Sequence, residues 1–198
     1  MAKEITTEQI KTLRDSTGIS VMQCKKALED AGGDIEKATV ILRKKGAEIA
    51  VKKADRVLGA GVIASYIHGN GAVGAMVELS CETDFVSKNN EFKTLAHDIA
   101  MHVAASNPTY LKAEDISEID KAKAREVFQK EIESKPAAIQ NKIMQGKLQA
   151  YFGETTLLDQ QFIKNPDLTV KALIEVGIQK FGEKIEIARF SRFSVFKR

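Results

Sequence analysis

The three histidines and two cysteines are the side chains most suited to metal binding or acid–base chemistry. His97 and His102 lie five residues apart in one predicted helix, so they point about 140° apart and do not share a ligand. His68 follows a predicted strand, with no carboxylate or cysteine close in the sequence. We expect surface histidines and no metal or other cofactor. Cys24 and Cys81 lack metal-site spacing, and we expect buried, reduced thiols.

The segment GNGAVG, residues 69–74, matches the glycine pattern of dinucleotide-binding loops. That pattern binds a pyrophosphate only where its glycines open a helix whose N-terminus faces the phosphates. Here the following residues alternate as they do in a strand, and residues 59–64 (GAGVIA) fail for the same reason. The sequence also shows no nucleophile elbow. We therefore expect no catalytic residues and no enzymatic activity.

The segment CETDFV, residues 81–86, lies where an alternating strand pattern ends and a helical pattern begins. On residue types alone, the favoured interpretation is that Phe85 packs into its own core and that Asp84 bonds nearby backbone amides. The alternative is that the Phe85 ring projects outward. A corner held from both sides would let such a ring dock at a small entropic cost, and burying it in a partner would contribute roughly 1.5–3 kcal/mol.

The composition is that of an ordinary globular protein, with 43% hydrophobic and 29% charged residues among 198. No run of 18 apolar residues occurs and the N-terminus lacks a signal-peptide core, so we expect a cytoplasmic protein without a membrane partner. The net charge of +3 argues against a dedicated nucleic-acid binder. That rival hypothesis would need a phosphate-contacting basic stripe, with steep salt dependence, from Lys44, Lys45, Lys52, Lys53 and Arg56.

Three short helices are predicted in residues 1–50, each with its own start and stop signals. The predicted N-caps are Thr6 or Thr7, Ser20 and Asp34, and the predicted stops are Gly18, Gly32 with Gly33, and Gly46. We expect residues 51–60 to be a linker. It belongs to a basic stretch, residues 43–56, for which a solvated tether is favoured over a binding role.

A small antiparallel sheet is predicted in the remaining domain, residues 61–198. Residues 62–68 and 73–81 alternate as strands, and the Asn70-Gly71 pair between them is a strong hairpin signal because both turn residues need positive φ. The second strand places one set of side chains on a single face: Val73, Ala75, Val77, Leu79 and Cys81. The chain ends in a further strand with either a bulge between Ile187 and Phe190 or burial on both faces.

Helices complete an α+β fold, in which a three-helix domain precedes a sheet core with packed helices and a helical hairpin. Ser87 is the predicted cap of a helix that ends at Asn107, and Thr169 is that of a helix over residues 170–181. Residues 114–153 predict two antiparallel helices broken near Pro136. Their narrow apolar stripes are compatible with an arm that stands off the body or with a hairpin packed flat on the sheet.

The Thr-Asp-Phe-Val sequence after a strand resembles the signature of the elongation factor Ts family, the guanine-nucleotide exchange factors of elongation factor Tu. Residues 13–38, LRDSTGISVMQCKKALEDAGGDIEKA, are similar to the three-helix, ubiquitin-associated-like domain of that family. Residues 98–108 and 148–163 also resemble family segments, in the expected order. The resemblance covers essentially the whole chain.

This resemblance implies a protein that binds elongation factor Tu carrying GDP, releases the nucleotide and is displaced when GTP enters. It assigns Thr83, Asp84, Phe85 and Val86 to the segment that disturbs the magnesium site of the partner. The phenylalanine inserts between side chains of the GTPase domain, and the aspartate helps to draw the magnesium-supporting segment away. Lys53 is an additional candidate contact with the partner. No direct nucleic-acid partner is implied.

The chain has room for one copy of a core that longer family members carry twice. The resemblance therefore implies a homodimer and a two-plus-two complex with elongation factor Tu. The candidate pairing surface is the C-terminal strand ARFSRFSVF, because an uncovered apolar edge strand promotes aggregation. Whether the helical hairpin contacts the GTPase or the second subunit stays open. The rival hypothesis of a nucleotide-dependent enzyme requires residues 69–74 to bind a nucleotide without any partner.

Overall fold

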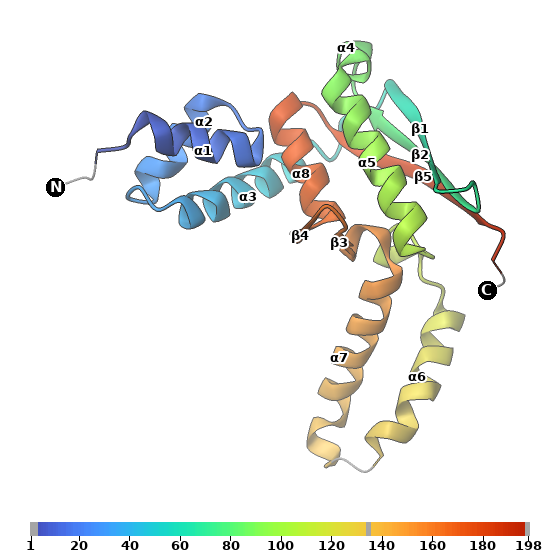
Figure 1. The fold of residues 1–198 in the computed structure, drawn as a ribbon. Helices are drawn as coiled ribbons and strands as arrows, with labels where there is room; N and C mark the ends of the chain where they lie inside the picture. Colours follow the sequence, from blue (N-terminus) through green and yellow to red (C-terminus); the bar gives the residue numbers. More distant parts are fainter. Residues whose placement is uncertain (1–3, 134–135, 197–198) are drawn as a thin grey trace.

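The computed structural model describes residues 4–133 and 136–196. Along the chain it places a helical N-terminal unit, then a sheet core into which a long helical hairpin is inserted, and the hairpin projects away from the rest (Figure 1). This mixture of helices and antiparallel strands confirms the predicted α+β class. Among the described residues, each helix is too short or too polar to cross a membrane.

The N-terminal unit forms as its local signals predict. The N-caps Thr6, Ser20 and Asp34 each accept a hydrogen bond from the backbone N–H three residues further on, and Gly18 ends the first helix with φ of 68°. The three helices share a small hydrophobic core that consists of Leu13, Ile19, Cys24, Ala27, Leu28, Ala38 and Leu42. These helices are α1 (Thr7–Thr17), α2 (Val21–Asp30) and α3 (Ile35–Lys52).

The predicted helix end at Gly46 is wrong, because α3 continues to Lys52. Gly46 is buried where α3 crosses α8 (Val170–Phe181). A Cβ at this position would lie 3.1 Å from Gln179 Oε1 and 3.3 Å from the backbone oxygen of Glu175. The glycine therefore permits close packing between two helices. Because α3 ends at Lys52, most of the basic stretch, residues 43–56, is helical. The domain limits at residues 50 and 60 stay a prediction.

The predicted hairpin is confirmed, and it forms an antiparallel sheet in the order β1-β2-β5. The register pairs Ala60 with Cys81 and His68 with Val73. The positive φ values occur at Gly69 and Gly71, so Asn70 does not adopt the conformation expected of it. The strands are β1 (Ala60–His68), β2 (Val73–Cys81) and β5 (Ile185–Ser194).

Of the two alternatives predicted for the C-terminal strand, the structure shows the bulge. Glu78 pairs with Arg189 and Leu79 pairs with Ile187, so Ala188 is the extra residue. One face of the sheet is covered, chiefly by α5 (Asn90–Ser106), with α8 packed beside it (Figure 1). The predicted inner face of β2 lies in the resulting core with Phe92, Ile99, Val103, Ile174, Ile178 and Ile187.

The entry into α5 differs from the prediction. A short helix, α4 (Asp84–Lys88), follows β2 directly, and Asn89 caps α5 by accepting a hydrogen bond from the Glu91 N–H. Ser87, the predicted cap, is instead buried within α4 and donates its hydroxyl to the backbone oxygen of Asp84. The end of α5 is as predicted, because Asn107 adopts a left-handed conformation with φ of 50°.

The helical hairpin stands off the body as an arm, which decides between the two arrangements that its pattern allowed (Figure 1). Residues 134 and 135 of the predicted break lie outside the described residues, and Pro136 is the N-cap of the second helix. Thr169 caps α8 as predicted. The arm consists of α6 (Glu118–Ile132) and α7 (Ala137–Thr155), and its base carries three elements that were not predicted: η2 (Leu157–Asp159), β3 (Gln161–Phe162) and β4 (Asn165–Thr169).

Candidate partner-binding site

Phe85 projects into solvent from the corner between β2 and α5, with 81% of its surface exposed. The interpretation that its ring packs into its own core is therefore wrong. The next residue, Val86, is only 4% exposed and packs into the sheet–helix core. We call residues 83–86 the corner segment. It is anchored through Val86 and presents Phe85 outward.

The short helix α4 explains this division of the two side chains. Successive residues of a helix point about 100° apart. Val86 and Ser87 take the buried side of α4, and Phe85 consequently lies on the exposed side. The predicted helix from Ser87 would not have placed Phe85 in a helix at all, so residue types alone could not fix the direction of its ring.

Asp84 lies beside Phe85 and forms an ion pair with Lys88 one turn later in α4. The hydrogen bond from the Lys88 ammonium, together with its charge, lowers the pKa of the Asp84 carboxyl. Both side chains are exposed, and exposed pairs within one helix contribute little to stability. The carboxylate is therefore ionised, accessible and able to change partners at small cost.

Thr83 connects the corner segment to a distant part of the chain. Its N–H and its hydroxyl both donate to the carboxylate of Glu183, at 3.0 and 2.5 Å. Glu183 lies in the turn between α8 and β5, and the sequence carried no signal for this contact because a hundred residues separate the partners.

Lys53 does not lie free in solvent. It follows α3, and its ammonium donates to the backbone oxygen of Gly182 at 2.7 Å. The structure thus brings Lys53 and Thr83 to the same turn, residues 182–184, although their side chains bond different atoms there. This placement was not anticipated from the sequence.

Of the three histidines, His102 is the one that does not lie at the surface. His68 and His97 are exposed, but His102 is fully buried, so the expectation of surface histidines is wrong for it. Its Nε2 lies 3.0 Å from Gln160 Oε1, and its Nδ1 accepts a hydrogen bond from the backbone N–H of Ile163. Burial lowers the pKa of this ring.

The glycine-rich segment and the two cysteines are parts of the fold. Residues 69–74 form the turn into β2, as the strand interpretation predicted. Cys24 and Cys81 are buried free thiols, as predicted. Within the described parts of the chain, no group of three or more acidic, histidine or cysteine side chains is arranged to hold a metal ion.

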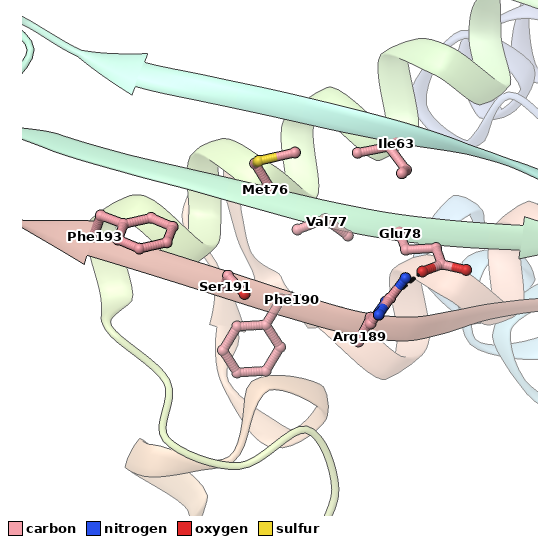
Figure 2. Close-up of a pocket in the computed structure, with 8 residues that line it drawn as sticks. All are labelled: Ile63, Met76, Val77, Glu78, Arg189, Phe190, Ser191 and Phe193. Atoms are coloured by element: carbon pink, nitrogen blue, oxygen red, sulfur yellow. Dashed lines mark hydrogen bonds and ion pairs between the residues drawn. The ribbon is translucent and has the colours of Figure 1, made fainter.

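The uncovered face of the sheet is a second candidate surface. A shallow hollow of about 240 Å³ lies on this face. Its lining side chains come from all three strands and include Ile63 on β1, Met76 on β2 and Phe193 on β5 (Figure 2). All three are exposed. At the edge of the hollow, Arg189 donates to the carboxylate of Glu78 at 2.6 Å. The apolar surface therefore extends across the face of the sheet and is not confined to the edge strand predicted from the sequence.

Comparisons with a family model and with individual known proteins all give the same family. A family model described as Elongation factor TS matches residues 1–195. A protein named elongation factor Ts from Carboxydothermus hydrogenoformans is 49% identical over 193 residues, which cover 96% of this chain and 89% of the relative. The elongation factor Ts of Thermodesulfovibrio yellowstonii is 50% identical over 192 residues, 96% of each chain. That of Thermotoga petrophila is 46% identical over 192 residues, covering 97% of this chain and 96% of the relative.

Proposed function

The chain belongs to the elongation factor Ts family, and from this premise we propose that it is the guanine-nucleotide exchange factor of elongation factor Tu. Its role is then to bind the GDP-bound GTPase during translation elongation and to release GDP so that GTP can enter. The observation that carries this proposal is the outward position of Phe85 on a corner segment anchored by the buried Val86.

In the proposed mechanism, the Phe85 ring inserts into an apolar site of the GTPase domain. Burying a phenylalanine contributes roughly 1.5–3 kcal/mol, and a preorganised corner loses little conformational entropy on docking. The exposed carboxylate of Asp84 arrives beside the ring and competes for the hydrogen bonds that hold the magnesium-supporting segment of the partner. Loosening that support removes positive charge where the diphosphate needs it.

Thermodynamic linkage connects this docking to nucleotide release. A factor that binds the nucleotide-free GTPase more tightly than the GDP-bound form must weaken GDP binding by the same ratio. No covalent bond is made or broken on the factor, so the mechanism needs no catalytic side chain and no cofactor. Thr83, Asp84, Phe85 and Val86 form the partner-binding segment in this proposal.

A role for Lys53 in partner binding is also part of the proposal, but in an indirect form. Its ammonium is bonded to Gly182. It therefore supports the turn beside the corner segment, and a direct bond to the GTPase would first require that contact to break.

We further propose that the protein is a homodimer that pairs through the uncovered face of the sheet and forms a two-plus-two complex with elongation factor Tu. Support comes from the exposed apolar side chains Ile63, Met76 and Phe193 on neighbouring strands. Soluble monomers rarely leave large contiguous apolar patches open to water.

The exchange function is tested with elongation factor Tu loaded with a fluorescent GDP analogue. Adding the wild-type factor should accelerate release of the analogue, and Phe85→Ala should lose most of that acceleration. The factor alone should bind no guanine nucleotide. Nucleotide binding by the isolated factor would favour the nucleotide-dependent enzyme, and steeply salt-dependent RNA binding would favour the nucleic-acid module.

A further inference from the structure

We propose that Glu183 is a positioning residue that holds the corner segment in the orientation needed for docking. This inference rests on the exchange function proposed above. Both carboxylate oxygens of Glu183 are used: Oε2 accepts the backbone N–H groups of Glu82 and Thr83, at 3.1 and 3.0 Å, and Oε1 accepts the Thr83 hydroxyl at 2.5 Å. Three donors of one short segment are thus bonded to a single side chain.

Thr83 connects the start of α4 to a side chain outside the helix. A threonine at an N-cap ordinarily accepts a hydrogen bond from the first turn of its own helix. Thr83 is the N-cap of α4, but its hydroxyl donates to Glu183 instead. Because α4 spans only Asp84–Lys88, we infer that this external contact helps to fix where the helix begins and hence where Phe85 points.

The Glu82 carboxylate bonds the turn 182–184 in return, so residues 82–83 and this turn each supply a carboxylate to the backbone of the other. Glu82 accepts the backbone N–H of Lys184 at 2.6 Å and the guanidinium of Arg56 at 3.1 Å. These bonds, the Lys184 contact first, lower the pKa of the Glu82 carboxyl. The last paired residues of β2 and β5 are Cys81 and Ile185, so the two carboxylates continue the connection just beyond the end of the backbone ladder.

The same turn is also bonded to the segment that follows the N-terminal unit. The Lys184 ammonium donates to the backbone oxygens of Ala54 and Arg56, at 2.7 and 3.2 Å. Lys53 donates to Gly182 from that segment. The turn 182–184 therefore connects the corner segment, through Glu183, to the residues after α3, through Gly182 and Lys184.

The chemistry of the contact favours a carboxylate. An ionised carboxylate offers acceptors on both oxygens and no donor, and charge-assisted bonds are stronger than neutral ones. Glu183→Gln can accept both backbone N–H groups on its amide oxygen and donate its N–H₂ to the Thr83 hydroxyl, but it lacks the charge that strengthens all three bonds. We therefore expect a graded response, in which Glu183→Ala has the larger effect and Glu183→Gln an intermediate one.

The first experiment needs no partner. The sequence contains no tryptophan, so Phe85→Trp introduces a single tryptophan at the tip of the corner segment, and its emission can be excited selectively over that of the three tyrosines. Adding Glu183→Ala in this background should lower the fluorescence anisotropy of Trp at position 85 while the circular dichroism spectrum is retained. A role limited to overall stability would lower the unfolding temperature but leave this anisotropy unchanged in the folded protein, and that result would overturn the inference.

The matched control is Glu91→Ala. Glu91 is an exposed carboxylate at the start of α5 whose contact is with the Lys180 ammonium, at 2.7 Å, and not with the corner segment. The control removes the same charge from the same region and should leave the anisotropy at the wild-type value. An equal loss of anisotropy in Glu91→Ala and Glu183→Ala would contradict a specific role for Glu183.

The second experiment measures GDP release from elongation factor Tu at a saturating concentration of each factor. Glu183→Ala should slow release by about tenfold, as expected for a displaced contact group, and Glu183→Gln by less. If the wild-type factor does not accelerate release, the exchange proposal itself fails, and if only Phe85→Ala leaves release unchanged, the role of the ring fails. If Phe85→Ala slows release but Glu183→Ala does not, only the role of Glu183 is overturned.

Discussion

Phe85 and Val86 are adjacent in the sequence, yet Phe85 is 81% exposed and Val86 is 4% exposed. The same short helix that buries Val86 in the sheet–helix core turns Phe85 away from it. Stability and partner binding are therefore assigned to neighbouring side chains, and substitutions should separate the two properties.

Val86→Ala should destabilise the fold by about 1–3 kcal/mol, because it leaves a cavity in a closely packed core. Phe85→Ala should change the free energy of unfolding by less than about 0.5 kcal/mol, as is usual for exposed positions. Urea unfolding followed by circular dichroism measures both. Similar destabilisation by the two substitutions would contradict the anchoring role of Val86.

Asp84→Asn should slow GDP release from elongation factor Tu without altering the urea midpoint of the factor. The carboxylate is exposed and its pair with Lys88 lies within a single helix, so the fold does not depend on it. Lys88→Gln is the control, since it breaks the same pair but keeps the carboxylate. If both variants slow release equally, the ion pair rather than the carboxylate is what matters.

His102 should make the stability of the protein depend on pH. Burial lowers its pKa in the folded state below the ordinary value of 6.5, so the unfolded chain binds the proton first as the pH falls. The free energy of unfolding should therefore decrease as the pH falls through about 6.5 and should level off below the folded-state pKa. The named partners of the ring, Gln160 and the Ile163 N–H, are neutral and do not compensate a charge.

Urea unfolding at a series of pH values between about 7.5 and 5 measures this dependence. His102→Gln should show a flatter profile than the wild type over the same range, whatever its stability at pH 7.5. Parallel profiles for the two proteins would show that His102 is not the group responsible.

Phe193→Lys should convert the proposed homodimer into monomers, because it places a charge on the exposed apolar face of the sheet. Ile119→Lys on the arm is the matched control, since it is also an exposed apolar residue. Light scattering after size-exclusion chromatography measures both. A monomeric wild type, or dissociation by the arm substitution alone, would contradict pairing through this face.

Local signals predicted much of the fold, because they depend on residues close together in the sequence. Thr6, Ser20 and Asp34 cap their helices through bonds to residues three positions away. The change in side-chain phase between Ile187 and Phe190 left a bulge in β5 as one of two alternatives, and the structure has it. Such features need no knowledge of the rest of the chain.

The errors concern contacts between distant segments. Gly46 is a typical helix-ending residue, and only its contact with α8 shows that it lies inside a helix. His102 is buried because α5 packs against the base of the arm through Gln160 and Ile163. At the site, the sequence identified the corner segment by resemblance but could not give the direction of Phe85 or its support by Glu183.

The most direct test of the central claim is the rate of GDP release from elongation factor Tu with Phe85→Ala compared with Ile119→Ala, a truncation of another exposed apolar residue. Phe85→Ala should slow release by roughly tenfold to a hundredfold, which corresponds to the loss of about 1.5–3 kcal/mol, and Ile119→Ala should match the wild type. A wild-type rate with Phe85→Ala would contradict the proposal that the exposed ring of the corner segment drives nucleotide release.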